Sequence, residues 1–182
     1  MKPGEAPLRD RVDLEIEDPA WSDALPHAPE LVRQAVEGAL VGRSEGGVTV
    51  LLTDDDTLRD LNARFRATDA PTNVLAFPAA ANPEGATGDI ALAFGVCERE
   101  ARTQGKPLAD HLRHLVIHGV LHLLGYDHQD EAEATAMEAR ERELLAGLGV
   151  DDPYAPERAS DDGPHDSLGD PSNVATHAVR RG

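Results

Sequence analysis

Three histidines and one glycine in the stretch HGVLHLLGYDH constrain this chain more than any other feature. His118 and His122 are four residues apart, so on a helix their side chains lie on the same face, one above the other. On a continuous helix His128 would point about 240° around the axis from that face. Gly125 resolves this conflict, because glycine adopts the left-handed conformation that ends a helix without steric cost. The stretch therefore predicts a helix over 107–124 that stops before Gly125, and a turn that brings His128 back toward the other two histidines.

This arrangement surrounds one point with three neutral imidazole nitrogens and leaves a fourth position open, which is the layout of a catalytic zinc site. The spacing equals that of the metzincin protease signature, HExxHxxGxxH, except that Gly119 replaces the glutamate that activates water in those proteases. We therefore expect His118, His122 and His128 to bind one Zn²⁺ per chain on a metzincin-like helix, without peptidase chemistry. Nickel, copper and iron also suit three histidines. The alternative is that all three are ordinary core or solvated residues.

Other polar residues near the motif have two open interpretations each. His111 and His114 precede His118 on the same predicted helix. Each is either a contact that orients a ligand or the substrate, or an ordinary surface residue. Asp127 either orients a ligand imidazole or caps the helix that follows, and we favour the cap. The acidic run 130–143 is interpreted as a solvated helix face.

The rest of the chain alternates between strand-like and helix-like patterns. Strands are expected at 11–17, 47–53, 73–77 and 88–94, and helices at 29–41, from Thr53 to about Phe65, 96–104, 107–124 and 130–147. This order predicts an α+β fold over residues 1–150, with a small mixed four-stranded sheet packed with about five helices. Residues 151–182 are rich in Asp, Pro, Ser and Gly and have no apolar period, so we expect an acidic, disordered C-terminal tail.

Charge and composition limit the classes of partner. The formal net charge is −17; seven acidic and three basic residues give the tail −4, which leaves −13 on residues 1–150. An acidic surface argues against wrapping duplex DNA, although it allows a local basic groove. Cys97 is the only cysteine, so no intrachain disulfide can form and a reducing cytoplasm is expected. We find no secretory signal, and no run approaches the ~20 apolar residues of a membrane helix.

Several stretches resemble the YbeY endoribonuclease family of bacterial rRNA maturation factors. HLRHLVIHGVLHLLGYDH is similar to that family's histidine signature, LNARFRATDAPTNVLAFP to its LNxxYRxxDxPTDVLSFP pattern, and TGDIALA to its LGDIxIS strand. DEAEATAMEARERELLAGLG is similar to its closing helix, so the resemblance spans residues 48–150. The chain departs from the pattern at Phe65, Asn73, Ala76 and Ala93, which replace a tyrosine, an aspartate and two serines.

The resemblance implies a zinc-dependent endoribonuclease specific for single-stranded RNA. Its implied role is 3′-end maturation of 16S rRNA and quality control of the small ribosomal subunit, whose rRNA and proteins are the implied partners. It also implies that the three histidines bind zinc and that Arg66 is the family's functionally important arginine. A guanidinium can bind a phosphate through two parallel hydrogen bonds, which makes Arg66 the candidate catalytic residue. Arg59 and Arg64 are interpreted as solvated helix charges.

Two alternatives stand beside this hypothesis. The first is a metzincin-type metalloprotease, which the missing glutamate at Gly119 disfavours. The second is a non-catalytic assembly factor with a structural zinc, whose acidic body binds basic ribosomal proteins. The residues do not decide whether the attacking nucleophile is a water molecule or a 2′-hydroxyl of the RNA.

Overall fold

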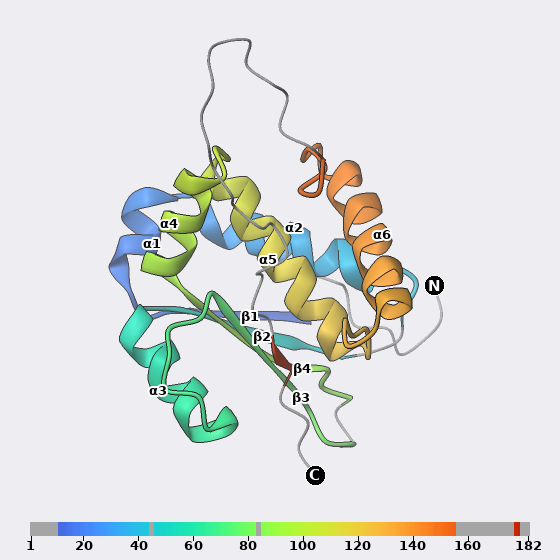
Figure 1. Ribbon diagram of the computed structural model, residues 1–182, viewed down its shortest axis with the longest axis horizontal. Coiled ribbons are helices and arrows are strands. Elements are labelled where there is room, and N and C mark those ends of the chain that lie inside the picture. The colour runs from blue at the N-terminus through green and yellow to red at the C-terminus, as the bar shows by residue number, and fades with distance from the viewer. Residues whose placement is uncertain (1–10, 44–45, 83–84, 156–176, 179–182) are drawn as a thin grey trace.

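The computed structural model describes residues 11–43, 46–82, 85–155 and 177–178. In these residues one mixed sheet is packed with helices (Figure 1). The elements in chain order are β1 (Val12–Ile16), α1 (Pro19–Ala24), α2 (Ala28–Leu40), β2 (Val48–Thr53), α3 (Asp55–Arg66), β3 (Val74–Pro78), β4 (Gly88–Ala93), α4 (Phe94–Thr103), α5 (Leu108–Leu123), α6 (Glu131–Gly147) and β5 (His177–Ala178). The expectation of an α+β fold with a mixed sheet is confirmed.

The strand order across the sheet is β1-β2-β4-β3-β5. β1, β2 and β4 run parallel to one another, whereas β3 is antiparallel to β4. The four predicted strands agree with β1 to β4 to within a residue or so at each end. The two-residue strand β5, which pairs in parallel with β3, was not expected, because it lies in the segment predicted to be a disordered tail.

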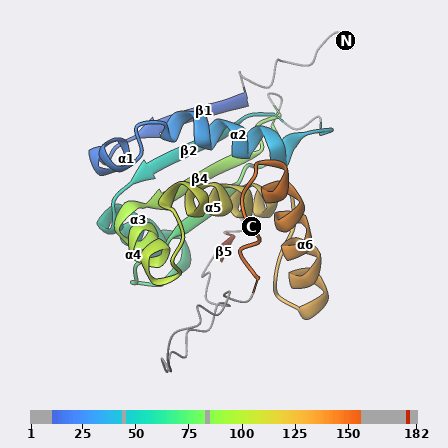
Figure 2. The same ribbon diagram turned by 90° about the horizontal axis from the view of Figure 1, so that it is seen from above.

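The two faces of the sheet carry different helices. Ile90 and Leu92 of β4 belong to the larger core, which is shared with α2 and α5. Ala91 and Ala93 alternate with them and belong to a smaller cluster around Leu58 of α3. α5 lies between α4 and α6 in both views (Figures 1 and 2). The helix that carries the histidines is therefore held by the sheet on one side and by a helix on each flank.

The structure has six helices in its described residues instead of about five, because the short helix α1 was not expected. Asp18 caps it by accepting a hydrogen bond from the Ala20 N–H (2.9 Å), and Pro19 occupies its first position. Trp21 of α1 is fully buried, and its indole N–H donates to the Thr53 carbonyl (3.0 Å). Cys97 is likewise fully buried in the core.

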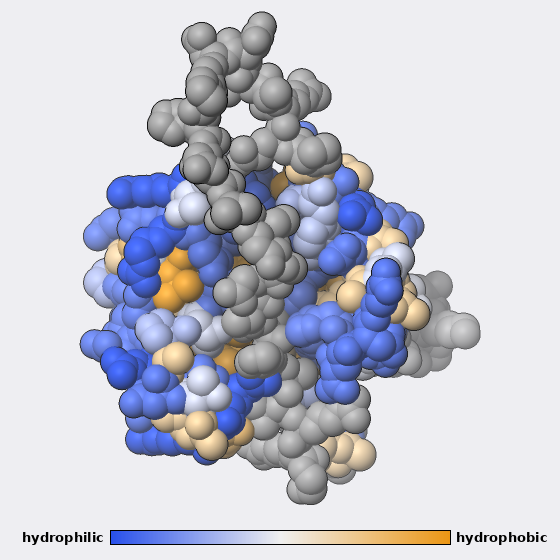
Figure 3. Space-filling model, viewed as in Figure 1, coloured by the Kyte–Doolittle hydropathy of each residue, from blue (hydrophilic) through white to orange (hydrophobic). Residues whose placement is uncertain are grey.

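The face shown in Figure 3 is mostly hydrophilic, with apolar residues in small, separated patches. Val41 and Phe65 are the exposed large hydrophobic residues of the described part of the chain. None of the helices that the structure describes is long and apolar enough to span a bilayer. The domain boundary at residue 150 and the tail stay predictions, since only 151–155 and 177–178 of that segment lie within the described residues.

Candidate metal centre

The C-terminal end of α5 has the geometry that the sequence predicts. The helix ends at Leu123, and Gly125 has a φ of 95°, in the left-handed region. The Gly125 N–H donates to the His122 carbonyl (3.1 Å), and the Tyr126 N–H donates to the Leu121 carbonyl (3.0 Å). These two bonds form the Schellman motif of a glycine-terminated helix. The turn that follows returns the chain toward the side of α5 that carries His118 and His122.

This turn brings the three predicted ligands together. The coordinating atoms of His118, His122 and His128 all lie within 4.8 Å of one another. The His128 ring is 5.9 Å from the His118 ring and 5.1 Å from the His122 ring, measured between centroids. His118 and His122 are 4 % and 3 % exposed, whereas His128 is half-buried. The cluster is therefore a largely buried site with its third imidazole at the rim.

The spacing and protonation of these imidazoles fit a metal ion. The Nε2 atoms of His118 and His122 are 3.2 Å apart. Two nitrogens bound to one tetrahedral Zn²⁺ at 2.0–2.1 Å would be about 3.3 Å apart. Burial, together with the neighbouring imidazoles, lowers the pKa of His122 to about 3. Burial also lowers the pKa of His118, against the opposing effect of Glu141. Both rings are therefore neutral at pH 7, as metal ligands must be.

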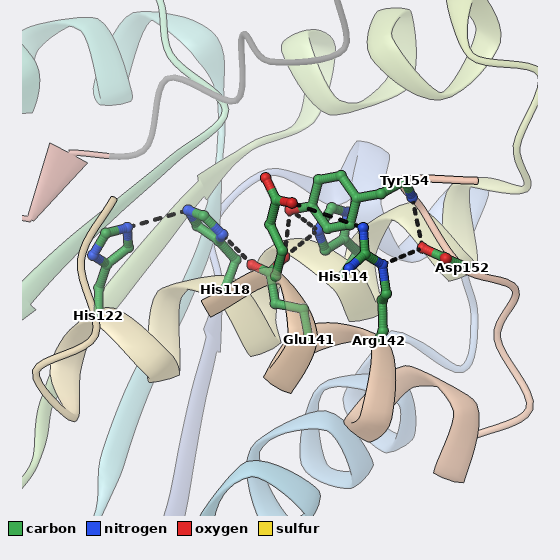
Figure 4. A network of polar contacts seen from close by, with 8 residues as sticks. His114, His118, His122, Glu141, Arg142, Asp152 and Tyr154 are labelled. Atoms are coloured by element: carbon green, nitrogen blue, oxygen red, sulfur yellow. Dashed lines mark hydrogen bonds and ion pairs between the residues drawn. The ribbon is translucent and has the colours of Figure 1, made fainter. Parts of the chain in front are cut away.

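His118 contacts a buried carboxylate, which the sequence analysis did not single out. Glu141 of α6 has no exposed area, and its Oε1 accepts a hydrogen bond from His118 Nδ1 (Figure 4). Its Oε2 contacts His114 Nε2 (3.3 Å) and accepts a hydrogen bond from the Tyr154 hydroxyl. Burial alone would raise the pKa of Glu141, but its bonds to the two histidines outweigh burial and hold that pKa below the usual range.

The interpretation of 130–143 as a solvated face is therefore wrong at Glu141. A periodic signal was present, because Glu141 lies four residues after Met137 and four before Leu145, both fully buried on α6. It thus belongs to the apolar stripe of the helix and not to its charged face. By contrast, Glu138 and Arg142 form an i,i+4 ion pair at 3.8 Å, with both side chains 41% exposed.

His114 and Asp127, two of the three polar residues considered near the motif, differ from the expected surface and capping roles. His114 is 3 % exposed and contacts Glu141, so the surface interpretation is wrong for it. Asp127 does not cap α6, because the cap is Asp130, which accepts a hydrogen bond from the Glu133 N–H (2.8 Å). The Asp127 carboxylate instead accepts a hydrogen bond from the His128 N–H (2.8 Å). This hydrogen bond of Asp127 lies within the turn that carries the third imidazole.

Residues 15–149 match the family described as Endoribonuclease YbeY. The chain belongs to this family. The Endoribonuclease YbeY of Maricaulis maris is 50% identical over 157 residues, which are 85% of this chain and 97% of that protein. The protein of the same name from Azorhizobium caulinodans is 48% identical over 153 residues, 79% of this chain and 96% of its own length. A solution structure from Thermotoga maritima has 26% identity and a TM-score of 0.49, and it covers 76% of this chain and 91% of its own.

Gly119, where this YbeY family member differs from the metzincin signature, has a packing role. A Cβ atom at this position would lie 3.0 Å from Cγ2 and 3.1 Å from Cδ1 of Ile90 on β4. Glycine therefore lets α5 approach the sheet closely, and a longer side chain here would meet the core. This contact gives a structural reason for the missing glutamate.

Two departures from the YbeY pattern have visible consequences. The Asn73 amide donates to both oxygens of Glu100 (3.1 and 3.2 Å), and the same carboxylate contacts His111 Nε2 (2.8 Å). An aspartate at position 73 would face Glu100 with a like charge, so asparagine suits this neighbour. Phe65 is 46 % exposed and packs edge-on against Phe77 at 5.3 Å. His111 is 1 % exposed, so its surface interpretation is also wrong.

Arg66 is the last residue of α3, and α3 packs on β3, β4 and α4. Its side chain is half-buried, and burial lowers its pKa from the ordinary arginine value. Arg59 and Arg64 behave as solvated helix charges, as expected: their side chains are 50% and 69% exposed and pair with Asp69 and Asp60. Of the three arginines in this window, Arg66 is thus the one partly withdrawn from solvent.

Proposed function

We propose that this protein is a metal-dependent endoribonuclease that cuts single-stranded RNA. The observation that carries the proposal is the convergence of three imidazoles, two of them buried and one half-buried, in a member of the YbeY endoribonuclease family. We propose 3′-end maturation of 16S rRNA and quality control of the small ribosomal subunit as its role, in the cytoplasm. The partners would be rRNA and the proteins of that subunit, and the net charge of −17 disfavours duplex DNA.

His118, His122 and His128 are the proposed ligands, and Zn²⁺ is the proposed ion, at one per chain. Imidazole nitrogens are preferred donors for this borderline-soft ion. When bound, zinc would polarise a phosphoryl oxygen and lower the pKa of a water molecule toward ~7. Three protein donors would leave the fourth position of a tetrahedral zinc ion for such a ligand.

Arg66 is the proposed catalytic residue outside the histidine cluster. Its guanidinium stays protonated at neutral pH in spite of burial, and its planar N–H donors match two phosphate oxygens. It would bind and orient the scissile phosphate and stabilise the negative charge that develops there. We further propose that His114 and Asp127 support the site indirectly, through Glu141 and through the turn at His128.

Cleavage of a 16S rRNA precursor by the purified protein tests this function. We expect the wild type to cut single-stranded segments, and His118→Ala to lose both bound zinc and cleavage. Arg66→Ala should keep zinc but cleave at least a hundredfold more slowly, since it removes one charge-stabilising donor. Arg64→Ala is the matched control, because Arg64 lies on the same helix and is 69% exposed. Equal cleavage by the wild type and His118→Ala would contradict the proposal.

A further inference from the structure

Glu141 is the most deeply buried acidic group that touches the metal centre. Its side chain has no exposed area, and it contacts three polar groups of the site, those of His118, His114 and Tyr154. Withdrawing a carboxylate from water is costly unless charged or hydrogen-bonding partners compensate it. The helix would gain by placing an apolar residue between Met137 and Leu145, so the carboxylate has a role other than filling the core.

The contact with His118 determines which nitrogen of that imidazole can bind a metal. A neutral imidazole has one N–H and one lone pair. Glu141 contacts Nδ1 and can only accept a hydrogen bond when ionised, so the proton is on Nδ1. The lone pair is then on Nε2, the atom that lies 3.2 Å from His122 Nε2. The carboxylate thereby fixes both the tautomer and the ring orientation of this ligand.

Tyr154 in turn holds Glu141 from the opposite side (Figure 4). Its hydroxyl donates to Glu141 Oε2, and its ring packs edge-on against His114 at 5.6 Å between centroids. The backbone around Tyr154 is fixed by Asp152, which accepts hydrogen bonds from the Tyr154 N–H (2.8 Å) and from Arg142 Nε (3.1 Å). The Arg142 guanidinium also lies 5.1 Å from the centre of the tyrosine ring. The residues after α6 thus fold back onto the buried face of α5.

We propose that Glu141 is a positioning residue that holds His118 as the Nδ1–H tautomer, and that Tyr154 clamps Glu141 so that segment 151–155 completes the metal centre. The inference rests on the proposed metal site. It predicts that metal affinity depends on a carboxylate and a phenol that do not contact the ion. Loss of a partner that orients a metal-bound histidine typically weakens binding about 10- to 100-fold.

A second possible role for Glu141 is that of a metal ligand, and the number of zinc ions bound per chain distinguishes the two roles. Coordinating atoms of His114, His118 and Glu141 also lie within 4.8 Å of one another, so this group could hold an ion itself. We favour the positioning role, because both carboxylate oxygens already accept hydrogen bonds and the Tyr154 hydroxyl occupies one of them. A positioning residue leaves the wild type with one zinc, whereas a ligand role adds a second.

Zinc titration of the full-length, metal-stripped protein against a chromophoric chelator tests the proposal. We expect one zinc per wild-type chain, an affinity about 10- to 100-fold lower for Glu141→Gln, and a several-fold reduction for Tyr154→Phe. Glu143→Gln, two residues along the same helix and 70% exposed, should bind like the wild type. Nitrogen-15 NMR of the imidazoles should show His118 as the Nδ1–H tautomer in the wild type and a mixture of tautomers in Glu141→Gln. Tyr154→Phe removes one hydroxyl only, so it keeps the test valid if Glu141→Gln does not fold.

The results of these measurements distinguish a failure of the proposed metal centre from a failure of the proposed positioning role. A wild type that binds no zinc would overturn the proposed metal centre itself. A wild type that binds one zinc, together with unchanged affinity in both variants and an unchanged His118 tautomer, would overturn the positioning role alone. Two zinc ions per wild-type chain, reduced to one in Glu141→Gln, would show that Glu141 is a ligand and would also overturn it.

Discussion

Replacement of Gly125 by alanine isolates the turn that brings His128 to the other two histidines. The φ of Gly125 is 95°, and an added Cβ would meet nothing within 4 Å. The cost of Gly125→Ala is therefore one of backbone conformation and not of packing. A non-glycine residue in the left-handed region costs about 1–2 kcal/mol. In a domain of this size, each 1 kcal/mol lowers Tm by about 2–4 °C, so we expect a decrease of about 2–8 °C.

Thermal unfolding of the metal-free protein, followed by circular dichroism, measures this cost. Gly38→Ala is a matched control, because Gly38 lies inside α2 with open space around its Cβ position. There the same methyl group should stabilise the helix, by up to about 1 kcal/mol. If the Gly125 variant relaxes by moving the turn, zinc binding must restore the strained conformation, and zinc affinity should fall by up to about thirtyfold. A Gly125→Ala variant that melts at or above the wild-type Tm would refute this account of the turn.

Three further changes test other parts of the account. In the metal-free protein the pKa of His122 is about 3 when folded and 6.5 when unfolded, so the unfolded chain binds more protons between these values. The free energy of unfolding should thus decrease, on the order of a few kcal/mol, as pH falls from 6.5 toward 3, and a His122→Gln variant should show a flatter pH profile in chemical denaturation. Gly119→Glu should have a Tm well below that of the wild type and should hydrolyse no peptide, because the carboxylate would meet Ile90 in the core. Peptidase activity in a zinc-loaded, stable variant would contradict this. Arg66→Lys should keep its zinc but cleave RNA more slowly than the wild type, since an ammonium lacks the planar pair of donors. An unchanged kcat/KM would contradict the proposed catalytic role of Arg66.

The histidine site was predictable because its signal is local in the sequence. A separation of four residues on a helix places His118 and His122 together whatever the rest of the fold is. Gly125 also predicts where the helix ends, and therefore that the following turn brings His128 back to the other two histidines. The strands were predictable for a similar reason, since alternating apolar residues identify them without knowledge of their partners.

The sequence did not reveal the contacts between residues that are distant in the chain. Glu141 lies 23 residues after His118 and within an acidic run, so its charge concealed its place on the apolar stripe of α6. Tyr154 contacts the site from a segment whose composition predicts disorder. Asp127 and Asp130 are both plausible caps by residue type, and only the backbone conformation decides for Asp130. In each case the deciding partner is distant in sequence or the choice depends on a dihedral angle.

X-ray absorption spectroscopy at the zinc edge, on wild-type protein purified with its metal, measures the ligands of the metal centre itself. We predict one zinc per chain, with three imidazole nitrogens at 2.0–2.1 Å and one further light-atom ligand. The same measurement on His128→Ala should show one fewer imidazole or no zinc. A protein without stoichiometric metal, or a wild-type spectrum that His128→Ala leaves unchanged, would contradict a metal centre built from His118, His122 and His128.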